Sequence, residues 1–154
     1  MISRNSSPSH TRARILLVDD NANGLAARKS VLEELGYRIV TCTSGADALD
    51  QFADLKFDLV VTDYKMPRMD GLELIGRLRK STPDLPIVLV SGYVDTLGMN
   101  EAATGADVVI QKSANEVSHL VRSVNRLLRR KSPTRKPVAS QSAPPKVKRK
   151  GAAS

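Results

Sequence analysis

The chain has 154 residues and a net charge of +8, which suits one domain with charged extensions. Its single cysteine, Cys42, excludes an intrachain disulfide, and no apolar run is long enough to span a membrane. The basic charge lies at the ends: residues 131–154 carry seven cations and no acid, whereas residues 15–130 carry a net charge of −2. The overall charge therefore does not indicate that the folded part binds nucleic acid.

The two ends of the chain are poor in large apolar residues. The C-terminal end mixes Pro and Lys with Ser and Ala, and it cannot bury enough surface to offset the entropy lost on ordering. We therefore expect residues 1–13 to form a disordered basic leader and residues 131–154 a disordered basic tail rich in Pro and Lys. The leader lacks the apolar segment of a secretory signal, so we expect a cytoplasmic protein. Residues 14–130 remain for one hydrophobic core.

Five short apolar runs alternate with helical patterns along this central part. We expect strands at residues 15–18, 38–42, 59–61, 87–90 and 106–111. We expect helices after an N-cap at Asn23, around residues 48–52, from Gly71 to Lys80, weakly from Tyr93 to Thr104, and from about Ala114 to Arg130. The core positions expected on the first and last helices include Leu25, Leu32, Leu35, Val117, Leu120 and Leu128.

Every expected strand is a continuous apolar run rather than an alternating one. Such strands are typical of a parallel sheet whose two faces are both covered by helices. The pattern therefore predicts an α/β fold with a doubly wound parallel sheet. Right-handed crossovers then place the carboxyl ends of all five strands at one edge of the sheet, where open α/β sheets form their binding sites.

Chemically active side chains follow four of the five expected strands: Asp19 and Asp20, then Asp63, Ser91 and Lys112. Three carboxylates brought together repel one another unless a cation lies between them, and oxygen ligands favour Mg²⁺. A lysine and a hydroxyl would complete a phosphoryl-transfer site in which Asp63 is the nucleophile. Each residue also has a simpler interpretation: the aspartates as turn or capping residues, Ser91 as the start of a loop, and Lys112 as a solvated charge.

Four segments in this order, LLVDDN, VVTDYKMPRMDG, IVLVSG and GADVVIQK, resemble the receiver domain of bacterial two-component response regulators. The resemblance covers roughly residues 14–130. It implies a flavodoxin-like fold with five helices and a five-stranded sheet in the order 2-1-3-4-5. It also implies that Asp63 accepts a phosphoryl group from a histidine kinase or a histidine phosphotransfer protein, and that the domain catalyses only its own phosphorylation and dephosphorylation.

The resemblance also implies a role for each site residue. Asp20 and Asp63 would bind Mg²⁺ directly, together with the main-chain carbonyl of Lys65, and Asp19 would act mainly through a water. Ser91 would hydrogen-bond the phosphoryl oxygen in the active state. Lys112 would pair with that oxygen as well.

The sequence departs from the family pattern at two positions. Ser113 replaces the proline that usually follows the lysine, and Val109 replaces an aromatic residue that usually turns inward on activation. In addition, Lys65 and Tyr93 flank the route of the hydrolytic water. Bulky or charged groups there would shield the phosphoryl group, so we expect slow autodephosphorylation.

About 24 residues follow the resembling segment, too few and too polar for a DNA-binding domain. We therefore expect a single-domain regulator that signals by contact with another protein, with the weak helix at residues 93–104 as the moving element. The alternative is a module that binds nucleic acid or an acidic surface weakly through residues 146–150 of the tail. A third interpretation, a receiver that works without phosphorylation, conflicts with the intact set of site residues.

Overall fold

A computed structural model of the chain describes residues 13–131, without the side chains of residues 95, 96, 130 and 131. The strands are β1 (Arg14–Val18), β2 (Arg38–Cys42), β3 (Leu59–Asp63), β4 (Ile87–Ser91) and β5 (Val108–Gln111). The helices are α1 (Ala22–Glu34), α2 (Gly45–Asp54), α3 (Gly71–Ser81), α4 (Val94–Leu97), α5 (Glu101–Thr104) and α6 (Glu116–Lys131). The expected leader and tail lie almost wholly outside the described residues.

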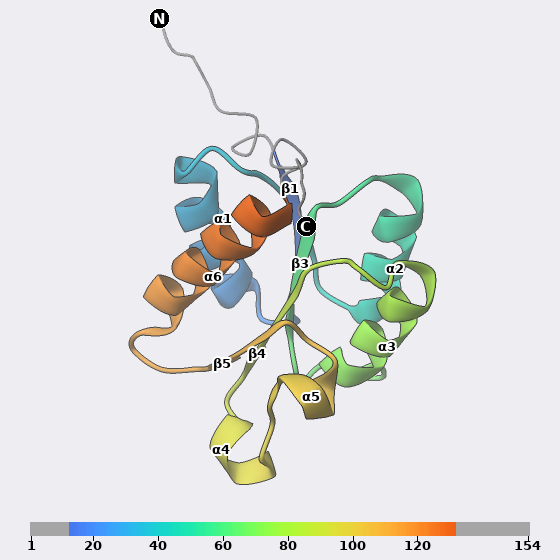
Figure 1. The fold of residues 1–154 in the computed structure, drawn as a ribbon, viewed down its shortest axis with the longest axis vertical. Coiled ribbons are helices and arrows are strands. Elements are labelled where there is room, and N and C mark those ends of the chain that lie inside the picture. The colour runs from blue at the N-terminus through green and yellow to red at the C-terminus, as the bar shows by residue number, and fades with distance from the viewer. Residues whose placement is uncertain (1–12, 132–154) are drawn as a thin grey trace, which may run out of the picture.

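The five strands form one parallel sheet in the order β2-β1-β3-β4-β5. Helices α1 and α6 cover one face of the sheet, and α2 and α3 cover the other (Figure 1). This is the predicted doubly wound, flavodoxin-like α/β fold. All carboxyl ends of the strands lie at one edge, toward α4 in Figure 1.

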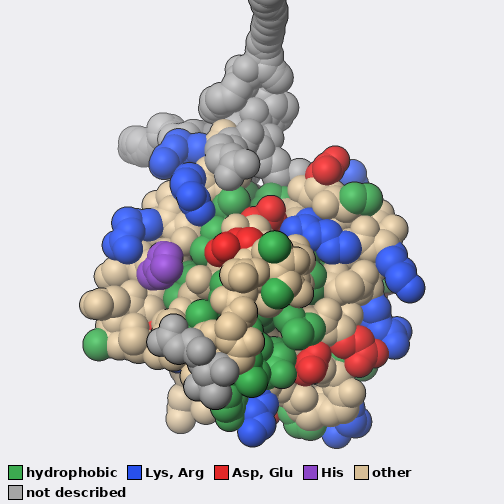
Figure 2. Space-filling model, turned by 60° about the horizontal axis from the view of Figure 1, so that its bottom comes forward, with side chains coloured by type: hydrophobic (Ala, Val, Ile, Leu, Met, Phe, Trp, Pro, Cys, Tyr) green, Lys and Arg blue, Asp and Glu red, His purple; other side chains and the backbone are tan. Residues whose placement is uncertain are grey.

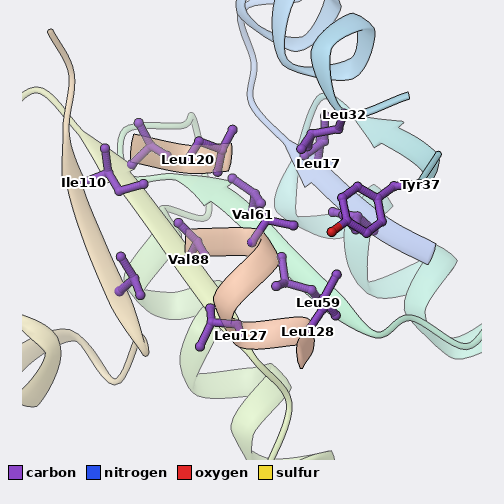
Figure 3. Packing of buried hydrophobic residues seen from close by; sticks show 14 of the residues in the cluster. Leu17, Leu32, Tyr37, Leu59, Val61, Val88, Ile110, Leu120, Leu127 and Leu128 are labelled. Carbon is purple, nitrogen blue, oxygen red and sulfur yellow. The ribbon is translucent and has the colours of Figure 1, made fainter. Parts of the chain in front are cut away.

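The sheet separates two hydrophobic cores, because successive strand residues point to opposite faces. Ile15 and Leu17 pack with α1 and α6, whereas Leu16 and Val18 pack with α2 and α3. Figure 3 shows the first core, in which leucines of α6 lie over Val61 and Val88. Both faces of the inner strands β1, β3 and β4 are therefore buried, which explains their continuous apolar runs, whereas four of the five residues of the edge strand β2 are exposed or half-buried.

The N-cap of the first helix lies two residues before the expected one. The side chain of Asn21, not Asn23, caps α1 by accepting hydrogen bonds from the backbone N–H groups of Asn23 and Gly24. The prediction for Asn23 is therefore wrong, because Asn21 already has the extended backbone of a capping residue. Leu35, expected in the core, is 40% exposed because the helix has ended before it.

The expected weak helix at residues 93–104 is present as the two four-residue helices α4 and α5. Gly98 ends α4 in the left-handed conformation, with φ of 64°, and the side chain of Asn100 caps α5. The last helix begins at Glu116 rather than Ala114, and Val117 is 36% exposed, so its predicted place in the core is wrong. Leu127, in contrast, is buried.

Arg79 links two segments at the opposite edge of the sheet, where the strands begin. Arg79 of α3 donates hydrogen bonds to the carbonyls of Pro83, Leu85 and Gly105 and forms an ion pair with Asp107 at 2.9 Å. The same carboxylate oxygen of Asp107 accepts a hydrogen bond from the N–H of Ile87. These contacts join the segment before β4 to the segment before β5.

Among the described residues, no helix has both the length and the apolar character that crossing a membrane requires.

Candidate acidic phosphoryl-acceptor site

The carboxyl ends of the strands surround a cleft of about 540 Å³. Its lining residues are Asp19, Asp20, Asn21, Asp63, Lys65, Gly92, Tyr93 and Lys112. Five of the six predicted site residues therefore line one cleft. The sixth, Ser91, is buried beside it, and its Oγ accepts a hydrogen bond from the N–H of Tyr93 at 2.9 Å.

The predicted aspartates converge from the loop after β1 and from the carboxyl end of β3. One carboxylate oxygen from each of Asp19, Asp20 and Asp63 lies within 4.8 Å of the others. Asp19 and Asp63 are buried, whereas Asp20 is exposed. Three carboxylates at this spacing, open to water on one side, fit the hard oxygen ligands that Mg²⁺ requires.

The surroundings of Asp63 act on its charge in opposite directions. Burial raises the pKa of its carboxyl above the ordinary value, and the neighbouring charge of Asp19 adds to this. Lys112 counteracts both effects through an ion pair, with 3.0 Å between its Nζ and Oδ1 of Asp63. A divalent cation among the carboxylates would favour the ionised form of Asp63 further.

Lys112 follows β5, which lies two strands from β3, so its side chain must span the end of β4 to reach Asp63. Its backbone N–H donates to the carbonyl of Ser91, which extends the pairing of β5 with β4 by one residue. The side chain then leans over the end of β4 toward Asp63. The ion pair thus depends on the register of the sheet.

The loop after β3 returns close to Asp63. The N–H of Gly71, the first residue of α3, donates to the carbonyl of Tyr64 at 2.7 Å. A Cβ atom at Gly71 would lie only 2.4 Å from the carbonyl oxygen of Asp63. Glycine is therefore required for α3 to start against the strand that carries the carboxylate.

Lys65 and Tyr93 meet across the mouth of the cleft. Lys65 Nζ donates to the hydroxyl of Tyr93 at 3.3 Å and lies 5.5 Å from the centre of its ring. Tyr64 packs edge-on against the same ring. These side chains form one partly exposed cover beside Asp63, at the end of the molecule that Figure 2 turns toward the viewer, where a green hydrophobic area lies among charged groups.

Two residues of the site's surroundings were not anticipated from the sequence. Arg28 of α1 is only 4% exposed and forms an ion pair with Asp19 at 2.8 Å and another with Glu116 at 2.7 Å. The sequence does indicate that Arg28 is buried, because Arg28 lies between Leu25 and Leu32 on the helix face expected in the core. A cation on a buried face requires anionic partners nearby.

Comparison with known proteins places this geometry in a family. A family model for the response regulator receiver domain matches residues 15–125. The chain is 37% identical over 129 residues to the response regulator MprA of Mycobacterium sp. (strain KMS), covering 80% of this chain and 54% of MprA. It is 29% identical to the response regulator receiver protein CpdR of Brucella abortus (strain 2308), covering 75% of this chain and 96% of CpdR.

Among solved structures, the response regulator TrrA of Thermotoga maritima in complex with Mg²⁺-BeF matches with a TM-score of 0.68 and 36% identity. The match covers 75% of this chain and 98% of TrrA. Some curated relatives are much longer: the chain spans 19% of the transcriptional regulatory protein GlrR of Escherichia coli (strain K12). The matching family model, the sheet order and the identity to MprA agree, and the chain belongs to the response regulator receiver domain family.

Proposed function

We propose that the chain is a phosphorylation-dependent switch of a two-component system. It accepts a phosphoryl group on Asp63 from the phosphohistidine of a histidine kinase or a histidine phosphotransfer protein, and it signals by contact with a downstream protein. The observation that carries the proposal is the buried Asp63 carboxylate, held between two further aspartates and the Lys112 ammonium. In this role the domain catalyses only its own phosphorylation and dephosphorylation.

In the transfer, the P–N bond of the donor breaks as a P–O bond to Asp63 forms, and the electron pair returns to the imidazole nitrogen. Asp19, Asp20, Asp63 and the main-chain carbonyl of Lys65 would hold Mg²⁺, which supplies positive charge for the phosphoryl oxygens. Lys112 already lies 3.0 Å from Asp63 and can pair with the same oxygens. The Ser91 hydroxyl accepts from Tyr93 N–H, so its own proton remains available to a phosphoryl oxygen.

The acceptor is tested with a small phosphoryl donor. Incubation with Mg²⁺ and acetyl phosphate or phosphoramidate should add the mass of one phosphoryl group, measured on the intact protein. Asp63→Asn should abolish the gain, because an amide is not a nucleophile toward phosphorus. An unchanged mass of the wild-type chain, or a gain that survives Asp63→Asn, would overturn the proposal.

The cover formed by Lys65 and Tyr93 predicts a long-lived phosphoryl group. Lys65→Ala and Tyr93→Ala should each shorten the lifetime of phospho-Asp63 by about tenfold, equivalent to ~1.4 kcal/mol of barrier, because water then reaches the site more freely. The measurement is the decay of the phosphorylated mass after removal of the donor. Leu97→Ala is the control, because Leu97 is 54% exposed and does not line the acidic cleft. Equal lifetimes in all variants would contradict the shielding role.

A further inference from the structure

Arg28 connects the acidic cleft to a helix that the cleft itself does not include. Its Nη1 donates to Oδ2 of Asp19 at 2.8 Å. Its Nε and Nη2 donate to Oε2 of Glu116, in the first turn of α6, at 3.0 and 2.7 Å. One buried guanidinium is therefore shared between a site carboxylate and the start of α6.

Both carboxylate oxygens of Asp19 have protein partners. Oδ1 accepts from the N–H of Asn21 at 2.9 Å, and Oδ2 accepts from Arg28. Asp19 is 1% exposed, so its charge is compensated mainly by Arg28. Any cation that binds beside Asp19 must therefore compete with the guanidinium for this charge.

The backbone makes room for this pair. Gly24 lies in the first turn of α1, and a Cβ atom there would be 2.9 Å from Oδ2 of Asp19 and 3.8 Å from Nη1 of Arg28. Contact closer than 3.0 Å forces a shift, and the buried Asp19 carboxylate has little freedom to move. The absence of a side chain at Gly24 thus allows the Asp19–Arg28 contact.

The other end of the bridge lies beside the loop that carries Lys112. The N–H of Glu116 donates to the carbonyl of Ser113, the residue that follows Lys112. Glu116 is therefore one hydrogen bond from the Lys112 loop and one ion pair from Arg28. The charged groups around the cleft form a group of four carboxylates and two cations, which one divalent ion would neutralise: Asp19, Asp20, Asp63, Glu116, Arg28 and Lys112.

We propose that Arg28 is a positioning residue that divides its guanidinium between Asp19 and Glu116 and so couples Mg²⁺ binding at the acidic cleft to the first turn of α6. When the ion shares the negative charge of Asp19, the ion pair between Asp19 and Arg28 weakens. The ion pair between Arg28 and Glu116 then strengthens. The inference rests on the proposed Mg²⁺ site, and it adds a route from that site to α6 that does not pass through Ser91 or Val109.

The test is a Mg²⁺ titration of the ¹⁵N-labelled full chain, followed by NMR. It yields the dissociation constant and reveals which amides respond. Arg28→Met should lower the dissociation constant by about tenfold, because Asp19 loses its competing cation. Glu116→Gln should raise it, because Arg28 then has Asp19 as its only anionic partner. A purely structural role predicts weaker binding or no change in both variants.

The amide response tests the coupling directly. In the wild-type chain, Mg²⁺ should shift the amides of residues 113–118, and in Arg28→Met this response should disappear while the amides of residues 19–21 still respond. Arg28→Lys keeps the positive charge but lacks the planar guanidinium that contacts both Asp19 and Glu116. This variant should therefore also lose the response of residues 113–118. The Lys29–Glu33 pair, exposed on the same helix, provides the controls Lys29→Met and Glu33→Gln, which should match the wild type.

Gly24→Ala provides a variant that leaves all charges in place. It should disturb the Asp19–Arg28 contact and reduce the response at residues 113–118, even if Arg28→Met fails to fold. Wild-type dissociation constants in the Arg28, Glu116 and Gly24 variants, with phosphorylation of Asp63 intact, would overturn the inference and leave the proposed function standing. If the wild-type chain binds no Mg²⁺, the proposed function itself fails.

Discussion

Asp63 is held in an environment that opposes its own charge. Burial raises the pKa of its carboxyl in the folded state, so the folded state binds this proton more tightly than the unfolded state does. The contribution of this group to stability is therefore complete below the pKa of the unfolded state and is lost as the pH rises through the pKa of the folded state. The ionised form of Asp63, which the proposed phosphoryl transfer needs, therefore destabilises the fold relative to the protonated form.

The raised pKa of Asp63 predicts how the thermal stability of Asp63→Asn differs from that of the wild type. At pH 7 without divalent ions, the variant should unfold a few degrees above the wild type in a thermal melt, because an uncharged amide replaces the buried carboxylate. The difference should shrink as the pH falls through the pKa of Asp63, and added Mg²⁺ should stabilise the wild type more than the variant. A lower melting temperature for Asp63→Asn at pH 7 would mean that the ion pair with Lys112 outweighs burial.

At the scale of single residues, the sequence predicts the acidic site but not its inner partner. Asp19, Asp20, Asp63 and Lys112 follow apolar runs within two residues, so the topology alone brings them together. Arg28 is paired with Glu116, 88 positions further along the chain. Such a contact depends on how α1 and α6 pack on the sheet, which no local pattern encodes.

At the scale of elements, the start of α3 is set by contact rather than by helix propensity. Gly71→Ala places a methyl group 2.4 Å from the Asp63 carbonyl oxygen and 3.0 Å from Leu89. We expect it to lower the free energy of unfolding by about 2 kcal/mol, measured in urea, because buried backbone must move. The matched control is Gly76→Ala on the same helix, where a Cβ meets nothing within 4 Å and should stabilise by about 0.5–1 kcal/mol. Equal effects at the two glycines would refute this explanation.

The strands were more predictable than the short helices. A strand buried on both faces must be apolar throughout, so its residues mark it directly. Helices α4 and α5 have four residues each and are defined by the positive φ angles of Gly98 and Gly105 and the cap at Asn100. The sequence predicts a weak helix there, but the position of its break depends on the backbone conformation that each glycine adopts.

At the scale of the whole molecule, charge is divided between the folded part and the C-terminal residues. Residues 15–130 carry a net charge of −2, whereas residues 131–154 carry +7. We predict that any DNA binding by the chain is weak and resides in residues 131–154. The affinity should fall steeply between about 50 and 200 mM salt, because each cation that binds a phosphate releases a counterion. Binding measured by fluorescence anisotropy should vanish when these residues are deleted, with phosphorylation unchanged. Binding that resists salt, or survives the deletion, would contradict this.

The contacts of Arg79 have a mechanical consequence for the sheet. They hold the amino ends of β4 and β5 together through the carbonyls of Leu85 and Gly105 and the carboxylate of Asp107. The carboxyl ends of the same two strands carry Ser91 and, one residue beyond β5, Lys112. Arg79 thus reinforces the amino ends of this strand pair, so we expect any displacement of the pair to be larger at the carboxyl ends. The phosphoryl group that we propose on Asp63 would therefore act at the ends of these strands that lie opposite the Arg79 contacts.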